Sequence, residues 1–307
     1  GFADVTESRA DGVDIGSRIW GYLPAGTHAV LQPGRLSARG FADSSAHRQA
    51  LATVYNQYSF CNADPGWHPR TEGLQALLQP LFITSFLIDD FLADEHFFGA
   101  RQVVLSSASS KTALGTAFCL ALRRGVRHAP TVVGLTSQAN LDFTRSLGCY
   151  DDVLPYDGLH ALDAAIPTAY IDFAGNAALR RSVHGHFVDS LTHSSAIGAT
   201  HWQALSEMAS GGPLPGPRPT LFFAPAQIKR RSGPAPEGWG PGGLQQRLAV
   251  AWTAFMRLVD KPDGWLQVVS RPGPQALAEA YQDLLAGRSN PRQGVMAALG
   301  AAGPRPA

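Results

Sequence analysis

RQVVLSSASSKTALGTAFCLALRRG, residues 101–125, is the stretch of sequence that decides the predicted fold. Three aliphatic residues in a row, 103–105, predict a strand that is buried on both faces of a sheet. Apolar residues then recur at helical spacing from Leu114 to Leu122, and Gly125 can end the helix. The small residues SSASSKTA connect these two elements. A strand, a tight turn and an amphipathic helix in this order form the first unit of a dinucleotide-binding fold.

The turn between this strand and this helix contains no glycine. The positions that usually carry glycine are occupied by Ser107, Ser110 and Ala113. Their small side chains still allow the backbone to approach a pyrophosphate, whose charge the helix N-terminus would stabilise. The alternative is a strand–turn–helix unit of an α/β protein that binds no ligand. The residues predicted to bind a dinucleotide in this turn are Ser107, Ser109, Ser110, Lys111 and Thr112.

Further apolar segments continue the pattern of strands that alternate with helices. They comprise residues 131–135, 152–156, 169–174, 191–198 and 221–224. Helices are expected between them, including one over 157–165, and a longer helix follows at 244–259. Alternation at intervals of about 20 to 30 residues predicts an α/β fold with a Rossmann-type, doubly wound parallel sheet of about six strands.

The two ends of the chain differ from this centre. Residues 1–35 contain short extended runs separated by turns, and residues 265–299 have the pattern strand, helix, loop, strand. We therefore expect one discontinuous β-rich domain, 1–79 with 264–307, around a dinucleotide-binding domain over 80–263. The chain begins Gly-Phe-Ala-Asp without an initiator methionine, and we expect the β-rich domain to lack its N-terminal part.

Composition limits the classes of partner. The chain has 307 residues with 25 basic and 24 acidic side chains, and its formal net charge of +1 favours neither nucleic acid nor a membrane surface. No run of 18 apolar residues predicts a membrane span, and no signal peptide is visible. The three cysteines form no CxxC pair, which predicts a reducing compartment, the cytoplasm, without a disulfide framework.

The end of the second predicted strand bears on the choice of nucleotide. An enzyme that uses NAD usually has an Asp or Glu there, which accepts hydrogen bonds from the ribose hydroxyls. Here stand Thr136 and Ser137, followed by Asn140. Neutral side chains do not repel a 2′-phosphate, and Lys111 can add positive charge, so NADP(H) is the favoured cofactor. The alternative role of Ser137 is to cap the following helix.

The ends of the later strands complete the predicted cofactor site. Gly175 and Asn176 follow the fourth strand, where a bound dinucleotide would have its ribose and nicotinamide. Ile197 and Gly198 follow the fifth strand, and Phe223 follows the sixth. The alternative for Gly175-Asn176 is a turn that simply ends a strand.

Two tyrosines are candidate proton donors, and no metal is expected. The segment VYNQY contains Tyr55 and Tyr58, whose hydroxyls can donate a proton to a substrate carbonyl or hydrogen-bond to it. The alternative for both is aromatic packing where the two predicted domains meet. The histidines that could suggest a metal site, but lack an acid or cysteine at a familiar spacing, are His184, His186, His193 and His201.

Several segments resemble the medium-chain dehydrogenase/reductase superfamily in its zinc-free, quinone-oxidoreductase-like branch. They are GVDIGSRIWGY (12–22), PLFITSFLIDDFL (80–92), VVLSSASSKTALG in place of the phosphate loop, TRSLGCYDDVLPY (144–156) and the tail AYQDLLAGRSNPRQGVMAAL. The chain is most similar to a family of unknown function within that superfamily, along essentially its whole length. It departs from the superfamily pattern in its glycine-free turn, and it has neither the Gly-His-Glu zinc motif nor a cluster of four cysteines.

This resemblance implies the architecture and the reaction class. The β-rich domain would be GroES-like, and the hydroxyl of Thr84 would lie near the nicotinamide. The alternative for Thr84 is a buried residue whose hydroxyl bonds to its own helix. The implied activity is an NADPH-dependent, metal-independent transfer of hydride to a carbonyl or an activated alkene of a small-molecule substrate. The alternative is a non-catalytic NADP-binding sensor or interaction protein on the same fold. Association of two copies as a homodimer is left open.

Overall fold

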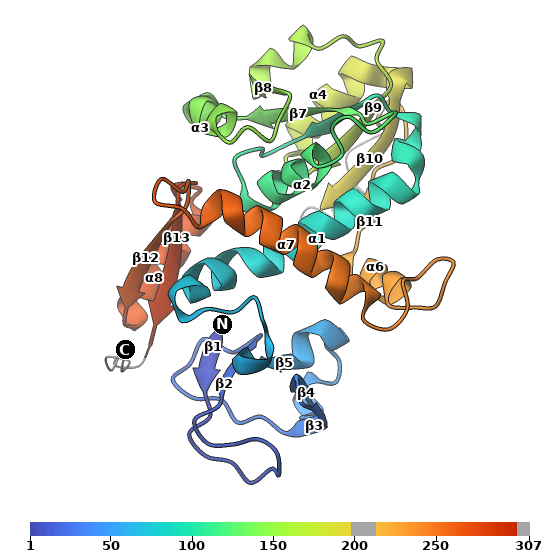
Figure 1. Cartoon of the computed structure of the whole chain (residues 1–307). Helices are drawn as coiled ribbons and strands as arrows, with labels where there is room; N and C mark the ends of the chain where they lie inside the picture. The colour runs from blue at the N-terminus through green and yellow to red at the C-terminus, as the bar shows by residue number, and fades with distance from the viewer. Residues whose placement is uncertain (198–212, 300–307) are drawn as a thin grey trace. The chain divides into compact units, whose positions relative to one another are not determined.

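The computed structural model describes residues 1–197 and 213–299 (Figure 1). The chain divides into two compact units, of which one comprises residues 1–79 with 258–307 and the other residues 80–257. Gly198 and His201 lie outside the described residues.

A six-stranded parallel sheet forms the centre of the unit 80–257, as the sequence predicted. Its spatial order is β11-β10-β9-β6-β7-β8, so the order of the strands reverses between β6 and β9. In such sheets the crevice outside the carboxyl ends of the strands, at the point of reversal, is where ligands bind. The strands are β6 Gln102–Leu105, β7 Thr131–Thr136, β8 Asp152–Pro155, β9 Thr168–Asp172, β10 Leu191–Ile197 and β11 Thr220–Phe222.

Helices connect these strands (Figure 1). Against one face of the sheet, α4 and η7 bury a cluster that includes Val104, Tyr170 and Val183, each 0% exposed. The helix expected over 157–165 is instead the short 3-10 helix η7, because Gly158, a poor helix former, stands in its first turn. The helices are α2 Lys111–Ala121, α3 Leu141–Ser146, α4 Ala177–Phe187, α6 Ala224–Arg231 and α7 Gly243–Val259, with η6 Gln138–Asn140, η7 Tyr156–Ala161 and η8 Val188–Ser190.

The longest helix, α1 (Glu72–Asp94), leads from the first unit into the second along the chain. The helical stretch 69–94 is long and apolar enough to cross a membrane, which is weak evidence because the core helices of folded proteins pass the same test. Four of its carboxylates are held in ion pairs, among them Asp89 with Arg123 at 2.7 Å and Asp90 with Arg231 at 2.6 Å. These buried ion pairs mark α1 as a core helix of the fold.

A left-handed turn of four residues, η5 (His96–Gly99), follows α1. The φ angles of His96, Phe97 and Phe98 are 49°, 53° and 54°, a conformation that costs roughly 1–2 kcal/mol for each residue that has a Cβ. The turn places the ring of Phe98 flat on the imidazole of His193, with 3.7 Å between the ring centroids and 3° between the planes. This packing against β10 offsets part of the backbone strain.

The other unit contains a five-stranded antiparallel sheet in the order β1-β2-β5-β4-β3. Its apolar core gathers Val13, Ile19, Phe41, Tyr58 and Phe60. The strands are β1 Phe2–Asp4, β2 Arg18–Gly21, β3 Pro33–Ser37, β4 Gly40–Asp43 and β5 Gln57–Phe60, and short 3-10 helices lie between them and before α1: η1 Ala46–Arg48, η2 Thr53–Asn56, η3 Cys61–Ala63 and η4 Pro69–Thr71.

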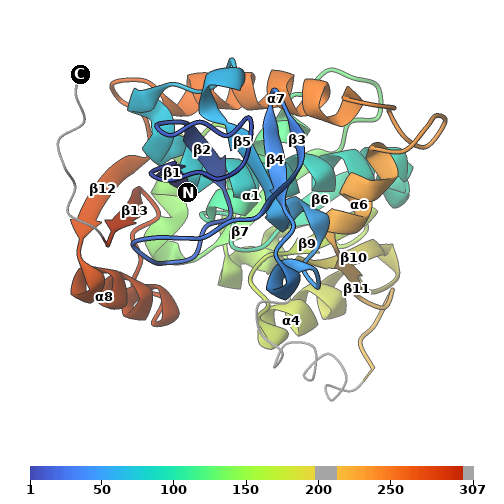
Figure 2. The ribbon, with the colours of Figure 1, turned by 90° about the horizontal axis from the view of Figure 1, so that it is seen from below.

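The tail of the chain forms a separate β-α-β module. Its parallel strands β12 (Gln267–Pro272) and β13 (Gln293–Ala298) pair with one another, and Figure 2 shows α8 (Pro274–Leu285) beside them. The front and the tail thus belong to one compact unit, but their strands form two sheets. A Cβ on Gly294 would lie 2.4 Å from a terminal methyl of Leu77, so β13 packs closely on the first turns of α1 and a larger residue there would displace the Leu77 side chain.

Candidate functional site

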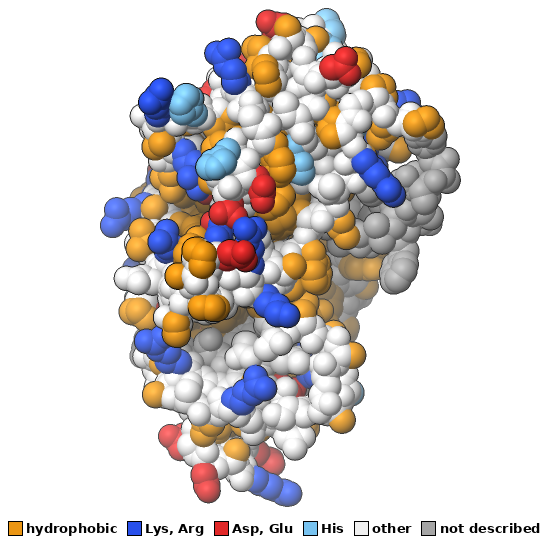
Figure 3. All heavy atoms as spheres, turned by 90° about the vertical axis from the view of Figure 1, so that its right-hand side faces the viewer, with side chains coloured by type: hydrophobic (Ala, Val, Ile, Leu, Met, Phe, Trp, Pro, Cys, Tyr) orange, Lys and Arg blue, Asp and Glu red, His pale blue; other side chains and the backbone are white. Residues whose placement is uncertain are grey.

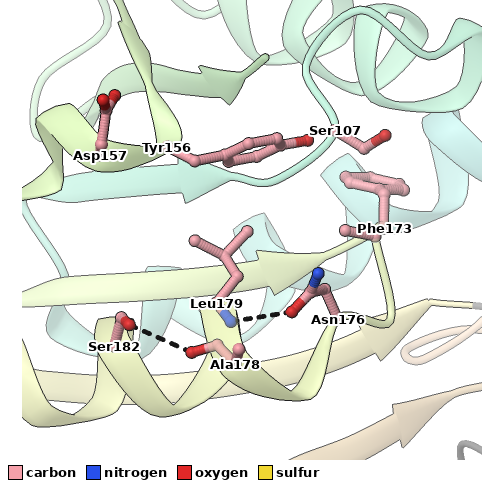
Figure 4. A pocket seen from close by; sticks show the side chains of 9 residues that line it. Ser107, Tyr156, Asp157, Phe173, Asn176, Ala178, Leu179 and Ser182 are labelled. Atoms are coloured by element: carbon pink, nitrogen blue, oxygen red, sulfur yellow. Dashed lines mark hydrogen bonds between the residues drawn. The ribbon is translucent and has the colours of Figure 1, made fainter.

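A pocket of about 470 Å³ lies at the carboxyl ends of the parallel strands. Figure 4 shows the ring of Tyr156 extended across it, with its hydroxyl toward Ser107 and with Leu179 facing the ring. Burial raises the pKa of Tyr156, so its phenol stays neutral at physiological pH. The residues that line the pocket are Ser107, Tyr156, Asp157, Phe173, Ala174, Asn176, Ala178, Leu179 and Ser182.

The turn after β6, residues 106–110, is tight although it contains no glycine. Ser107 takes the left-handed φ of +49° that a glycine would adopt more easily. The amide of Ser110 donates to the carbonyl of Ser107 at 2.8 Å, and the amide of Ala108 donates to Leu135 in β7 at 3.0 Å. From the other side, the Tyr150 hydroxyl donates to the carbonyl of Ala108 at 2.8 Å. These bonds hold the turn against β7.

The first turn of α2 adds the groups that an anion would meet. Ser110 is the N-cap residue, and its hydroxyl oxygen accepts from the amide of Ala113 at 3.3 Å. Asn140 donates to the hydroxyl oxygen of Ser109 at 3.1 Å, which brings together two segments that the sequence assigned to the same site. Lys111 opens the helix, and burial lowers its pKa. Four predicted residues, Ser109, Ser110, Lys111 and Asn140, thus lie around one helix N-terminus.

At the end of β7, Thr136 and Ser137 differ in exposure. Thr136 is completely buried, and its hydroxyl has no hydrogen-bond partner among the described residues. Ser137 is half-buried and precedes η6, but its side chain makes no capping hydrogen bond. Its hydroxyl is therefore not used as a cap, and Ser137 is the better placed of the two to meet a ligand.

A buried polar network connects the ends of β6 and β9. Asp172 at the end of β9 accepts from the Ser106 hydroxyl at 2.9 Å and pairs with Arg180 of α4 at 2.8 Å. Gly175, with a φ of +64°, donates its amide to Asp172 at 3.0 Å, and Asn176 caps α4 by accepting from the amide of Leu179. We did not predict Ser106, Asp172 or Arg180, although a charge inside the apolar run AYIDFA signals a buried carboxylate that needs a partner.

Apart from Ser107 and Asn176, the predicted cofactor residues do not line this pocket. Ile197 ends β10 and pairs with Phe222, and Phe223 lies at the N-cap position of α6 with 57% of its surface exposed. Thr84 is a half-buried residue of α1. Gly198 lies outside the described residues. The structure therefore places Ser107 and Asn176 in the pocket lining, and the pairing of Ala196 with Asp172 brings the end of β10 beside the end of β9.

The two tyrosines proposed as proton donors have different surroundings. Tyr58 is 2% exposed, its ring stacks on Phe41 with 5.4 Å between centroids, and its hydroxyl donates to the carbonyl of Tyr22 at 2.8 Å. Burial raises the pKa of Tyr58. Tyr55 is 42% exposed and lies beside the ring of Tyr22. The hydroxyl of Tyr58 is already committed to the backbone, and its surroundings are those of a core residue.

We expect Tyr58→Phe to lower the free energy of unfolding by about 0.5–1.5 kcal/mol, the net contribution of one hydrogen bond. The loss is modest because Arg48 also donates to the carbonyl of Tyr22, at 3.2 Å. Denaturant unfolding of Tyr58→Phe and Tyr55→Phe measures the difference, since Tyr55 is exposed. A stable Tyr58→Phe protein that loses a catalytic activity which Tyr55→Phe retains would contradict the packing role and restore Tyr58 as a candidate proton donor.

The described residues hold no group of three or more His, Cys, Asp or Glu side chains that could bind a metal. The three histidines of the predicted list that the structure describes make separate hydrogen bonds. His184 bonds to the carbonyl of Pro215 and to Ser194, His186 to the carbonyl of Leu162, and His193 to Ser195.

Charge is mixed over the surface that Figure 3 presents. Apart from the residues drawn in grey, basic and acidic side chains are interspersed with apolar ones on this face. It therefore shows no continuous field of one sign of the kind that attracts nucleic acid.

Comparison with known proteins places the chain in a family. Residues 1–290 match the model of a family described as a protein of unknown function, DUF2855. The chain belongs to this family. No curated protein sequence matches it.

Solved structures with a similar fold include the CurK enoyl reductase, with 11% identity, 95% of this chain and 75% of that chain covered, and a TM-score of 0.50. Others are a putative NADPH:quinone reductase from Mesorhizobium loti (11% identity, 92% and 71% covered, TM-score 0.49) and the yhdH oxidoreductase from Salmonella enterica in complex with NADP (13% identity, 96% and 79% covered, TM-score 0.47). The predicted fold class is confirmed: a Rossmann-type parallel sheet together with a GroES-like β-rich part.

Proposed function

We propose that this DUF2855 protein is an NADPH-dependent, metal-independent oxidoreductase. It transfers hydride to a carbonyl or an activated alkene of a small organic substrate. The observation that carries the proposal is the pocket at the reversal point of the sheet, next to the N-terminus of α2 and to a β7 end that has no carboxylate. In such folds this is where a dinucleotide binds.

The groups around this pocket fit a dinucleotide in their chemistry. The small side chains of Ser107 and Ser110 leave the backbone of the turn accessible to a pyrophosphate, and the N-terminus of α2 favours its negative charge. The rings of Tyr156 and Phe173 in the pocket offer flat apolar surfaces to the planar rings of a dinucleotide. When bound, the nicotinamide supplies the hydride, and the protein's contribution is to bind and orient the two reactants.

The choice of NADPH over NADH rests on Ser137, Asn140 and Lys111. None of the three repels a 2′-phosphate, and the ammonium group of Lys111 attracts it. The structural relatives described as NADPH:quinone reductase and as an NADP complex are consistent with the same choice. All three cysteines are buried and free, which fits a protein of the cytoplasm.

Calorimetry with both cofactors tests this assignment. A charge-assisted contact contributes about 1.5–3 kcal/mol, so NADPH should bind at least about tenfold more tightly than NADH. Ser137→Asp should narrow or reverse this difference, because a carboxylate repels the 2′-phosphate and accepts from a ribose hydroxyl. Ser232→Asp adds the same charge to an exposed serine after α6 and should leave the ratio unchanged.

Equal binding of both cofactors, unaffected by Ser137→Asp, would refute the role of the β7 end. Consumption of NADPH with a panel of enones, ketones and quinones then separates the two classes of function. Turnover of any of these substrates supports the oxidoreductase. Tight binding of NADPH without turnover of the panel favours the alternative, a sensor or interaction protein on the same fold.

A further inference from the structure

Ser106 and Asp172 occupy the two strand ends between which the order of the sheet reverses. Ser106 directly follows β6, and Asp172 is the last residue of β9. Their side chains are 0% and 2% exposed, and the Ser106 hydroxyl donates to Oδ1 of Asp172 at 2.9 Å. This hydrogen bond joins the ends of the two strands below the floor of the crevice.

The same two side chains hold the backbone that follows β9. The Ser106 hydroxyl oxygen accepts from the amides of Phe173 at 2.9 Å and Ala174 at 3.0 Å. Oδ1 of Asp172 accepts from the amides of Ala174 at 3.1 Å and Gly175 at 3.0 Å. Three successive amides are thus fixed, and the hydroxyl uses its one donor and both acceptor sites.

The residues that these bonds fix are walls of the pocket. Phe173 and Ala174 line it, Asn176 follows the held amides, and Ser107 follows Ser106 on the other strand. A shift of the segment 173–175 would therefore move one wall of the pocket relative to the glycine-free turn. Sites that bind with precision need such support behind the residues that touch the ligand.

Stability alone does not account for a charged group at this place. Oδ2 of Asp172 is neutralised by Arg180, whose Nε and Nη2 lie 2.9 Å and 2.8 Å away. Well-packed apolar residues can usually replace such a buried ion pair without loss of stability. An apolar pair would offer no acceptors to the amides of residues 173–175, and those acceptors are what set the shape of the pocket wall.

We propose that Ser106 and Asp172 are positioning residues for the dinucleotide: they fix the segment 173–175 against the end of β6, so that Phe173 and Asn176 meet the bound cofactor in a defined arrangement. This role rests on the proposed function, because it assigns the pocket to a dinucleotide. It adds two residues that do not touch the ligand and that act through their neighbours.

Ser106→Ala is the decisive variant, because it removes three hydrogen bonds while it leaves the Asp172–Arg180 pair in place. Ser194→Ala is the matched control: Ser194 is a 1% exposed serine of β10, bonded to His184 at 3.0 Å and absent from the pocket lining.

Calorimetry with NADPH, melting temperature and amide hydrogen exchange are measured for both variants. Ser106→Ala should weaken NADPH binding about tenfold or more and accelerate exchange at residues 173–175. Ser194→Ala should also lower the melting temperature, with NADPH binding within about twofold of wild type.

Three outcomes overturn the proposal, and they are distinguishable. NADPH binding by Ser106→Ala within twofold of the unaltered chain refutes the positioning role alone. Equal losses of binding in Ser106→Ala and Ser194→Ala reduce the role of Ser106 to general stability. An unaltered chain that binds no dinucleotide refutes the proposed function, and the positioning role with it, even when the exchange at residues 173–175 responds to Ser106→Ala.

Discussion

Asp172→Asn should destabilise the protein by about 3–5 kcal/mol, because it removes one charge of a buried ion pair and leaves the other without compensation. The side chains of Arg180 and Asp172 are 6% and 1% exposed, and their closest charged atoms are 2.8 Å apart. Asparagine keeps the size of the side chain and one acceptor, so the loss measures the charge rather than a cavity. Denaturant unfolding of the complete chain gives the free energy.

A surface pair provides the comparison for this experiment. Asp283 of α8 forms an ion pair with Arg288, which follows the helix, with 3.0 Å between Oδ1 and Nη2, and their side chains are 43% and 64% exposed. Asp283→Asn should lower the free energy of unfolding by at most about 1 kcal/mol. The double variant Asp172→Asn/Arg180→Met should recover part of the stability, because it also removes the buried positive charge. A single Asp172→Asn variant that lies within 1 kcal/mol of wild type would show that Arg180 finds another partner.

The centre of the parallel sheet could be predicted because its strands β6 and β9 are buried on both faces. Such strands read as continuous apolar runs, and QVVL and TAYID, at residues 102–105 and 168–172, are buried at every position. The left-handed turn at 96–99 could not be predicted in the same way. Its conformation depends on the contact of Phe98 with His193, which lies 95 positions later in the chain. No local sequence pattern predicts that contact.

The residues of the candidate site also divide into those that local sequence predicts and those that only distant contacts bring together. The turn after β6 and the end of β7 follow from local sequence, because a strand, a tight turn and a helix determine which residues lie at the carboxyl edge. Ser106 and Asp172 are 66 residues apart, and only the pairing of β6 with β9 brings them together. Tyr156 lines the pocket for a similar reason. The strand β8 ends beside β7, and Tyr156, which follows β8, points its ring toward Ser107 (Figure 4).

The tyrosines show where residue type alone misleads. A phenol can donate a proton or fill a core, and the sequence VYNQY contains nothing that separates the two roles. The alternation of β5, with residues 57 and 59 exposed and 58 and 60 buried, decides that Tyr58 points into the core. The register of β5 against β2 and β4 sets which side chains face inward, and that register is a property of the sheet.

A pH dependence should arise from His193, independently of any cofactor. Its imidazole is 8% exposed, lies flat on Phe98 and bonds to Ser195 at 2.7 Å. Burial lowers its pKa from the usual 6.5 to about 4. Above pH 6.5 the imidazole is neutral in both the folded and the unfolded chain, and it contributes no pH dependence there.

Between pH 6.5 and 4 the unfolded chain binds a proton at His193 that the folded chain does not, so stability should fall as the pH falls. The contribution of His193 to this loss should be about 2–3 kcal/mol at pH 4, since each unit of pKa difference corresponds to about 1.4 kcal/mol. His193→Gln should lower stability at pH 7 but flatten this slope, whereas His47→Gln, at an exposed position, should leave the slope as in the unaltered chain. Unfolding free energies measured at half-unit intervals give the slopes, and the imidazole resonance followed by NMR gives the pKa directly. An unchanged slope in His193→Gln would contradict this prediction. It would mean that the imidazole of His193 is protonated in the folded state, after it has left the ring of Phe98 and the left-handed turn has opened in mild acid.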